Sequence, residues 1–411
     1  MIKSETKDLE KIYEKINSEE NKMVEFLGEM IKIRALDPRS GGEGEYAKAK
    51  WLENELKKMG FKVEWYNCPD DRVPSKVRPS LVVREEGNDK SKTLWIVTHT
   101  DIVPEGDLKK WNTDPYKPFV KDGKIFGRGV EDNGQELVAS LFALKSLKEL
   151  GIKPKINVAL AFVADEETGS EKGIKYLIEK KLFKKEDLIV VPDGGNSDGT
   201  LVEVAEKSIA WIKFTIEGKQ SHASMPHLGK NAMRAGMRLG ILIDEKLHEK
   251  FSKKNELFDP PVSTFEPTKK EANVPNINTI PGEDVFYFDC RVLPEYKLSD
   301  VMSTIEECVK KIEKEYDVKV RIEKMQFEDA APTTPVDAPV VKLLIESVKK
   351  VYKNQPKPGG IGGGTCAAIF RRAGYNAVVW AKLDDTCHGP NEYAIIDNLI
   401  GDAKVYATMM S

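Results

Sequence analysis

The sequence predicts an α/β protein, in which a mixed-sheet domain with helices on both faces is interrupted by a smaller α+β domain. Helix-like and strand-like segments alternate through the first half of the chain, and the pattern changes near Lys207 to short alternating strands with two helices. With 411 residues, 40% of them hydrophobic, the chain is long enough to bury two cores.

The elements before Lys207 alternate as expected for a sheet with covering helices. Apolar residues at helical spacing predict helices over residues 9–33, 43–59 and 135–150. Alternating or continuous apolar runs predict strands over residues 61–66, 94–98, 158–163 and 188–191. The helix at 135–150 ends before Gly151, a residue typical of helix C-caps. Sheets of this kind bind ligands beyond the carboxyl ends of their strands.

The segment after Lys207 predicts a small sheet with two helices. The expected strands are residues 210–216, 284–292 and 319–325, and the expected helices are residues 231–250 and 301–316. The alternation over residues 211–216 suits an edge strand at which two copies of the chain would pair. Prolines at 332, 335 and 339 mark a connection, after which residues 340–352 resume helical periodicity.

Charge and composition exclude several classes of partner. Lys and Arg number 64 against 67 Asp and Glu, a formal charge of -3, so we expect no nucleic-acid or anionic-membrane partner. No apolar h-region opens the chain and no apolar stretch approaches the roughly 20 residues that span a bilayer, so a cytoplasmic protein is expected. Five cysteines without a Cys-x-x-Cys pair indicate reduced thiols.

Residue types that bind first-row metals follow four strand-like runs and one glycine-rich turn. These residues are His99, Asp132, Glu167, Asp193 and His388. A parallel sheet would gather them at one edge, so the sequence predicts a metal centre there. Because His388 follows the small inserted domain, the metal domain must be discontinuous, with residues 1–206 and 327–411 forming it and residues 207–326 forming the insert.

Five nitrogen and oxygen ligands exceed the three that an open catalytic zinc site uses. A carboxylate shared between two ions resolves the excess. If Asp132 bridges, one ion has His99, Asp132 and Asp193, and the other has Asp132, Glu167 and His388. Two ions about 3.5–4 Å apart acidify a shared water and stabilise negative charge on oxygen.

Two carboxylates beside these ligands have expected roles outside the first coordination shell. Glu166 would take a proton from the attacking water and pass it to the leaving nitrogen. Asp101, two residues after His99, would orient the His99 ring. Taken alone, Glu166 and Glu167 would indicate only a solvated acidic turn. The other four ligand candidates favour a role in the metal centre instead.

Five spaced motifs carry a resemblance to a known family. They are Thr98-His99-Thr100-Asp101, the loop 111–118, Gly127-Arg128-Gly129 before Asp132, Asp165-Glu166-Glu167-Thr168-Gly169-Ser170 and His388-Gly389-Pro390-Asn391-Glu392. The chain resembles the zinc-dependent family of succinyl-diaminopimelate desuccinylases, acetylornithine deacetylases, aminoacylases and glutamate carboxypeptidases. The resemblance implies a dizinc catalytic domain, an inserted four-stranded lid that often forms a homodimer, and a cis peptide bond after Asp132.

The resemblance extends to residues that contact substrate. His222, in Gly218-Lys219-Gln220-Ser221-His222-Ala223, is similar to a histidine that stabilises the oxyanion in the partner subunit's site. Asn278 and Arg291 resemble the family's binders of a substrate carboxylate, and Gly364 and Thr365 end a Gly-Gly-Gly-Thr loop that also contacts substrate. Arg suits bidentate carboxylate recognition, and the Gly-Thr pair offers backbone donors. A surface ion pair and a tight turn are the alternatives.

The expected function is a metal-dependent amidohydrolase that cleaves a small N-acyl amino acid with a free carboxylate, such as succinyl-diaminopimelate or acetylornithine. Zinc is the expected metal, with Co²⁺ or Mn²⁺ able to use the same ligands. The alternative is a dipeptidase or carboxypeptidase of the same family. Asp193 favours a dipeptidase, since the family's aminopeptidases and dipeptidases tend to have Asp there, whereas its deacylases and carboxypeptidases usually have Glu. The chain also departs from many relatives at Gly134 and Cys366.

Two readings from other classes are weaker. Gly195-Asn196-Ser197-Asp198-Gly199 matches the Gly-x-Ser-x-Gly of a serine hydrolase, with Asp384 or Asp385 and His388 completing a triad. However, an alternating segment follows Ser197 where that motif requires a helix. A non-catalytic binding protein on the same fold would be expected to lack a ligand or the base, and this chain has them all.

Overall fold

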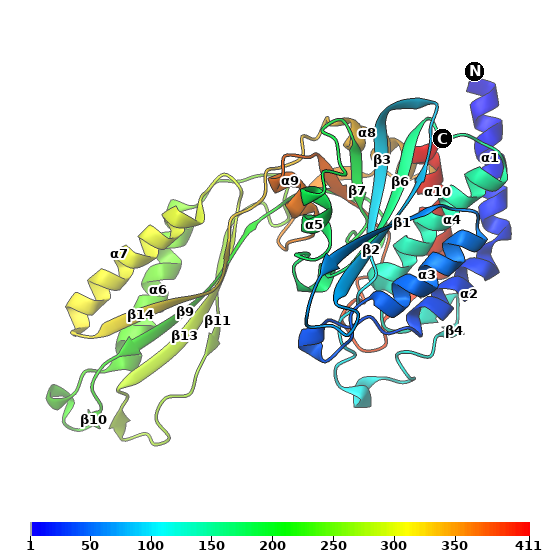
Figure 1. The fold of residues 1–411 in the computed structure, drawn as a ribbon. Helices are drawn as coiled ribbons and strands as arrows, with labels where there is room; N and C mark the ends of the chain where they lie inside the picture. Colours follow the sequence, from blue (N-terminus) through cyan, green and yellow to red (C-terminus); the bar gives the residue numbers. More distant parts are fainter. Residues whose placement is uncertain (1) are drawn as a thin grey trace. The chain divides into compact units, whose positions relative to one another are not determined.

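The computed structural model describes residues 2–411, and the chain divides into two compact units (Figure 1). Residues 1–204, 334–359 and 365–411 form the first unit, and residues 205–333 and 360–364 form the second. The sequence-based division assigned residues 205–206, 327–333 and 360–364 to the discontinuous domain, whereas the structure groups them with the insert. Each unit is described by itself.

The first unit is built on an eight-stranded sheet in the order β1-β2-β6-β3-β7-β16-β8-β15. These strands are β1 (Val63–Pro69), β2 (Val77–Glu85), β3 (Asp89–His99), β6 (Ile156–Val163), β7 (Leu188–Val191), β8 (Leu201–Glu206), β15 (Lys357–Ile361) and β16 (Ala377–Val379). The neighbours β6, β3, β7 and β16 run parallel, while β1, β2 and β8 pair in antiparallel fashion. The predicted mixed sheet is confirmed.

Helices cover both faces of this sheet. They are α1 (Ile2–Ser18), α2 (Glu20–Ile31), α3 (Tyr46–Lys58), α4 (Glu136–Glu149), α5 (Ile174–Glu179), α8 (Pro339–Tyr352), α9 (Ala367–Arg372) and α10 (Ile396–Met410). On one face α5 and α9 pack against a core that includes Trp95, Phe183 and Phe370, and α3, α4, α8 and α10 lie on the other. Every residue of α4 from Glu136 to Leu147 is buried, because α10 covers its outer side.

A three-stranded sheet lies apart from the main one in the first unit. It pairs β4 (Phe119–Lys121), β5 (Lys124–Phe126) and β17 (Tyr393–Ile395). No helix or strand was predicted between His99 and Gly129, and β4 and β5 lie in that stretch. Pairing of β17 with β5 joins the segment before Asp132 to the segment after His388.

The second unit is a four-stranded antiparallel sheet in the order β11-β13-β9-β14 with two helices. Its elements are β9 (Ser208–Glu217), β11 (Thr264–Lys270), β13 (Glu283–Val292), β14 (Lys319–Glu328), α6 (Ala232–Lys250) and α7 (Leu298–Tyr316), with a short pair β10 (Ser221–His222) and β12 (Thr279–Ile280). Alternate residues of β9, such as Ile212 and Phe214, are buried in a core shared with α6 and α7.

One expectation about this unit is wrong. The segment 211–216 was predicted to be an edge strand, but β9 is paired on both sides, with β13 and with β14. Buried and exposed residues alternate along β9 because helices cover one face of this sheet and not the other. On the uncovered face, Trp211 is 43% exposed. Among residues 2–411, none of the helices is both long and apolar enough to cross a membrane.

Candidate metal centre

The carboxyl ends of three adjacent parallel strands bring four candidate residues together. His99 is the last residue of β3, Asp193 lies two residues after β7, and Glu166 and Glu167 form the 3-10 turn Glu166–Thr168 after β6. Their strands are neighbours in the order β6-β3-β7. This is the edge at which α/β sheets bind ligands.

Asp132 lies between two histidines, with one carboxylate oxygen facing each. Its Oδ1 is 2.8 Å from His99 Nε2, and its Oδ2 is 3.1 Å from His388 Nε2. Asp132 lies in the irregular helical turn Val130–Gln135 that leads into α4, and the Asp132–Asn133 peptide bond is cis, as the resemblance implies. A carboxylate that faces two separate ligand groups has the arrangement of a bridging ligand.

Each histidine also faces a second carboxylate. His99 Nε2 lies 3.3 Å from Asp193 Oδ1, and His388 Nε2 lies 3.1 Å from Glu167 Oε2. Two groups of three ligand atoms result, each group within 4.8 Å, and Asp132 belongs to both. They are His99 with Asp132 and Asp193, and Asp132 with Glu167 and His388.

These residues fit divalent cations. The buried Glu167 Oε1 has no hydrogen-bond partner among the described residues, although a buried oxygen of this kind normally has one. Hydrogen bonds that the His388 ring donates to the Asp132 and Glu167 carboxylates raise the pKa of His388 to about 10, so the cluster strongly favours positive charge. Imidazole nitrogens and carboxylate oxygens are donors that first-row divalent metals accept.

Glu166 lies beside these ligands with its backbone fixed by Asp101. The Asp101 carboxylate accepts hydrogen bonds from the backbone N–H groups of Glu166 and Glu167, each at 3.1 Å. Burial and the nearby Asp193 charge raise the pKa of the Glu166 carboxyl well above its ordinary value. A carboxylate with a raised pKa is a better proton acceptor, which is the property a general base requires.

Asp101 contacts His99 differently from the expectation. The His99 Nδ1 atom shares a 2.9 Å hydrogen bond with the main-chain oxygen of Asp101, and the Asp101 carboxylate lies 3.6 Å from it. The main-chain contact therefore orients the ring and directs Nε2 toward Asp132. The side chain of Asp101 instead holds the Glu166–Glu167 turn.

A buried arginine, not identified from the sequence, supports the same turn. Arg78 on β2 is fully buried, and its guanidinium contacts Asp37 at 2.9 Å, Asp165 at 3.5 Å and the carboxylate of Glu45. Asp165 has a left-handed backbone (φ 63°) and starts the turn, and its amide donates to Glu45 at 3.2 Å. Several charge-assisted contacts thus stabilise an uncommon conformation next to Glu166.

The bridging aspartate is held by another residue that sequence reasoning passed over. Glu392 is fully buried and accepts hydrogen bonds from the backbone amides of Gly129, Glu131 and Asp132 at 3.0–3.2 Å. Arg128 donates to it at 2.6 Å. Burial raises the pKa of Glu392 to about 7. Its position four residues after His388 was the available signal.

Glu131 holds the loop that carries His388. Its carboxylate accepts from the backbone N–H of Asp384 at 2.8 Å and from the Thr386 hydroxyl at 2.7 Å. His388 itself has a left-handed backbone (φ 60°) and a side chain 56% exposed. The Asp132 turn and the His388 loop therefore hold each other through Glu131 and Glu392.

The predicted residues of the insert form a separate set in the second unit. His222 pairs with Thr279 across β10 and β12, and the Ala223 amide donates to the Asn278 carbonyl at 2.9 Å, so His222 and Asn278 are neighbours. Both side chains are exposed. His222 Nδ1 accepts from the Ser224 amide at 3.1 Å, so the other ring nitrogen, Nε2, carries the hydrogen that the ring can donate.

Arg291 already has protein partners. Its guanidinium makes a bidentate contact with Asp289, at 2.6 and 3.0 Å, and donates to the Gly362 carbonyl at 2.8 Å. A substrate carboxylate would therefore share Arg291 with Asp289. Gly364 ends the glycine-rich segment of the second unit, and Thr365 begins the part of the first unit that leads into α9.

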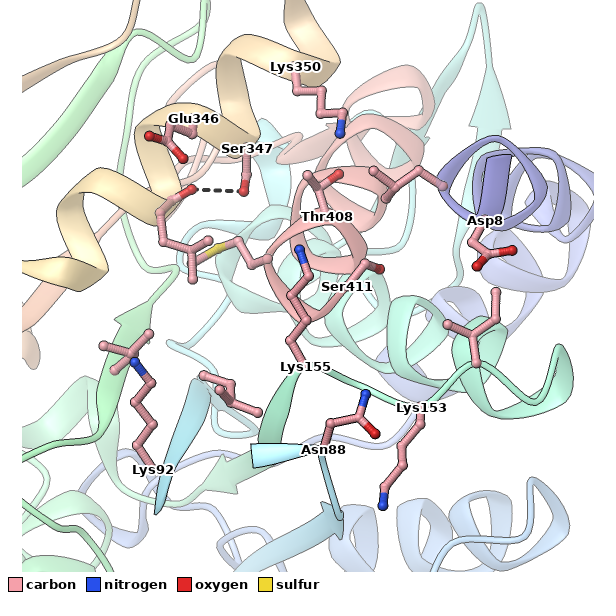
Figure 2. Close-up of a pocket in the computed structure, with 16 residues that line it drawn as sticks. Asp8, Asn88, Lys92, Lys153, Lys155, Glu346, Ser347, Lys350, Thr408 and Ser411 are labelled. Atoms are coloured by element: carbon pink, nitrogen blue, oxygen red, sulfur yellow. Dashed lines mark hydrogen bonds between the residues drawn. The ribbon is translucent and has the colours of Figure 1, made fainter. Parts of the chain in front are cut away.

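A hollow of about 520 Å³ in the first unit lies away from this cluster (Figure 2). It is lined at the amino ends of β3, β6 and β7, for example by Lys92, Ile156 and Leu188, whereas the metal-ligand candidates follow the carboxyl ends. None of the metal-ligand candidates lines it. The hollow is therefore distinct from the candidate metal centre.

The serine-hydrolase reading does not fit the structure. Ser197 lies in a turn closed by a hydrogen bond from the Gly199 amide to the Asn196 carbonyl, and the strand β8 follows it. A nucleophile elbow needs a helix at that place.

Comparison with known proteins agrees with the metal centre. The sequence matches the family described as Peptidase family M20/M25/M40 over residues 95–411. An uncharacterized metallohydrolase of Methanocaldococcus jannaschii is 42% identical over 400 residues, which cover 93% of this chain and 97% of that protein. A succinyl-diaminopimelate desuccinylase of Pelagibacter ubique is 25% identical over 388 residues, 93% of this chain and 96% of that protein.

Solved structures show the same fold at lower sequence identity. Human carnosine dipeptidase 1 aligns with a TM-score of 0.75 and 17% identity over 98% of each chain. The fold is therefore shared with a protein of distant sequence.

Proposed function

Because this chain belongs to peptidase family M20/M25/M40 and is a metallohydrolase of amide or peptide bonds, we propose that it is a dinuclear amidohydrolase acting on a small N-acyl amino acid. The observation that carries this proposal is Asp132, whose two carboxylate oxygens face two histidines, each accompanied by one further carboxylate. That arrangement provides two three-residue ligand sets around one shared residue.

The proposed ligand sets are those that the geometry groups. His99, Asp132 and Asp193 would hold one ion, and Asp132, Glu167 and His388 the other. Zinc is the proposed metal, and Co²⁺ or Mn²⁺ could use the same donors. When bound, the ions supply electrophilic activation of a water and of the scissile carbonyl.

Glu166 is the proposed general base. Its carboxylate accepts a proton from the water as the water oxygen attacks the carbonyl carbon, and then gives that proton to the nitrogen as the C–N bond breaks. The Asp101 carboxylate holds the Glu166 amide, so it positions this base without taking part in proton transfer. The Arg78 contacts fix the start of the same turn.

The second unit, together with Thr365 of the first unit, would supply substrate recognition. By the resemblance of its motif, His222 is assigned the hydrogen bond to the developing oxyanion, in a homodimer formed through this unit. Asn278, Arg291, Gly364 and Thr365 are assigned to the free carboxylate of the substrate. The bidentate geometry of Arg291 suits a carboxylate, although Asp289 shares it.

A dipeptidase or carboxypeptidase of the same family is the second candidate. Asp193 favours the dipeptidase, because in the family that the sequence motifs resemble dipeptidases tend to have Asp at this position, and deacylases and carboxypeptidases usually have Glu. The likeness to a succinyl-diaminopimelate desuccinylase favours the deacylase instead.

The test is hydrolysis of N-succinyl-diaminopimelate, N-acetylornithine and a dipeptide panel, with bound metal quantified before and after chelation. We expect turnover of an acylated amino acid that chelation abolishes and Zn²⁺ restores, with metal-loaded Glu166→Gln as the matched inactive control. Preference for dipeptides would favour the second candidate. Turnover that persists after complete metal removal would contradict both.

A further inference from the structure

A buried lysine that the proposed mechanism does not use contacts the segment that carries His99. Lys48 is 2% exposed, and its Nζ donates a 2.9 Å hydrogen bond to the main-chain oxygen of Thr100. Thr100 stands between His99, a proposed metal ligand, and Asp101, whose carboxylate accepts from the Glu166 amide. The lysine therefore contacts the residue that joins a metal ligand to the support of the proposed base.

Thr100 is held from two elements of the first unit. Its amide and its hydroxyl both donate to the main-chain oxygen of Val163, the last residue of β6, at 2.9 and 3.0 Å. Its carbonyl accepts from Lys48, the third residue of α3. The amide belongs to the peptide group shared with His99, and the carbonyl belongs to the one shared with Asp101. Because peptide groups are planar, these contacts fix the backbone on both sides of Thr100.

Helix stability does not explain a lysine at this position. Lys48 lies in the first turn of α3, where the helix dipole disfavours a positive charge, and a buried charge is costly unless it is paired. Burial lowers the pKa of Lys48 to about 8. Three buried carboxylates oppose that decrease, and in order of effect they are Asp101, Glu45 and Glu392. These carboxylates, and not the helix, account for the positive charge.

The three carboxylates share one role, because each accepts a hydrogen bond from the backbone of a segment that carries proposed active-site residues. The segments are the Glu166 turn for Asp101, Asp165 at the start of that turn for Glu45, and the Asp132 turn for Glu392. Glu45 and Lys48 are three residues apart at the start of α3, so they lie on the same side of that helix. One ammonium group thus offsets the charge of the carboxylates that hold these segments.

We propose that Lys48 is a positioning residue of the metal centre, which acts by fixing the Thr100 carbonyl and by offsetting the charge of the surrounding carboxylates. His99 then keeps the position that its metal ion requires, and Glu166 keeps the position from which it accepts the proton. Lys48 itself takes no part in proton transfer. This inference rests on the proposed dinuclear centre.

The test is the zinc affinity and the steady-state kinetics of Lys48→Met in the full-length protein. Methionine has nearly the length of lysine but neither its charge nor its hydrogen-bond donors. The matched control is Lys145→Met. Lys145 is also a buried lysine of the first unit, 9% exposed, but its partner is Glu19 at 2.8 Å, at the junction of α1 and α2.

We expect Lys48→Met to bind zinc about 10- to 100-fold more weakly in competition with a chelator, as for other residues that orient metal ligands. At saturating zinc its kcat should fall with little change in KM, because the misplaced Glu166 acts in the transition state and does not bind substrate. Lys145→Met should change the Tm but neither the zinc affinity nor kcat.

A measurement on wild type tests the inference even if Lys48→Met does not fold. By thermodynamic linkage, zinc must strengthen any contact that strengthens zinc binding. Reductive methylation followed by peptide mass spectrometry measures how often the amine of each lysine becomes accessible through local opening. We expect zinc to slow the modification of Lys48 by about tenfold or more, to match the expected change in affinity, and to leave the rate at Lys145 unchanged.

Wild-type zinc affinity and kcat in folded Lys48→Met would refute the role of Lys48 and leave the proposed function standing. An equal loss of zinc affinity in Lys145→Met, or a rate of Lys48 modification that zinc does not change, would also refute it. Failure of wild type to bind any divalent metal would overturn both proposals.

Discussion

Among single residues, Glu166 has the largest proposed part in the reaction. Glu166→Gln keeps the size of the side chain but removes the carboxylate that would accept the water's proton. We expect kcat to fall by roughly 10²–10⁴-fold, the range for loss of a general base, with two metal ions still bound. Steady-state kinetics with metal analysis on the same sample measure both, and a near-normal rate would remove Glu166 from this role.

His222 is predicted to act on the reacting carbonyl from the second unit. Loss of one oxyanion donor costs about 10²–10³-fold in kcat, so His222→Ala should lower turnover by that amount without loss of metal. His227→Ala, a change to the other histidine of the same segment, is the matched control and should leave kcat unchanged. Equal rates for wild type and His222→Ala would make the histidine structural.

The residues that sequence reasoning identified share a recognisable origin. His99, Asp193 and the Glu166–Glu167 pair follow apolar strand runs, and parallel strands bring such ends together. Arg78 and Glu392 could not be identified in this way. Their roles depend on which backbone amides and carboxylates the fold brings to them, and that information is absent from the local pattern.

At the scale of elements, Glu392 joins the Asp132 turn to the His388 loop. Glu392→Gln removes the negative charge that three backbone amides and Arg128 approach. We expect metal affinity to fall about 10- to 100-fold, as for other residues that orient ligands. Titration against a competing chelator measures this, and an unchanged affinity would show that Asp132 keeps its position without Glu392.

The junction of α1 and α2 holds a buried carboxylate clamped by lysines. Glu19 is 2% exposed, and although burial opposes its charge, contacts with Lys145, Lys15 and Lys22 lower its pKa from 4.5 to about 2. A pKa lowered on folding stabilises the protein fully above about pH 4.5, and that contribution disappears as the pH falls to about 2. The shift corresponds to about 3 kcal/mol.

Glu19→Gln should therefore lower the free energy of unfolding at pH 7 and differ progressively less from wild type between pH 5 and pH 2. Chemical denaturation of the whole protein across this pH range measures the difference in the free energy of unfolding. Glu20→Gln, at an exposed neighbouring position, is the control and should have little effect at any pH. A gap between wild type and Glu19→Gln that stays constant with pH would contradict the prediction.

Helices and strands with clear periodicity were predicted, and the exceptions have physical causes. Residues 9–33 were assigned to one helix, but the chain forms α1 and α2, which meet at Glu19 without a proline or glycine to mark the break. The C-terminal helix α10 was not predicted. Its residues are buried almost all round against α4 and α8, so it lacks the polar face on which amphipathic patterns depend.

For the molecule as a whole, the discontinuous metal domain was predicted from the ligand residues more than from patterns of helices and strands. His388 can join His99 and Asp132 only if the chain returns to the first sheet after the insert, and β16 does so beside β7. Finer boundaries were not foreseeable, because the glycine-rich residues 360–364 group with the second unit through contacts such as the one from Arg291.

The proposed metal centre requires two ions that share Asp132. Anomalous diffraction from crystals of the zinc-loaded protein, collected at the zinc edge, tests it most directly. We expect two anomalous peaks about 3.5–4 Å apart with the Asp132 carboxylate between them, one beside His99 and Asp193 and the other beside Glu167 and His388. A single peak, or peaks that Asp132 does not join, would contradict it.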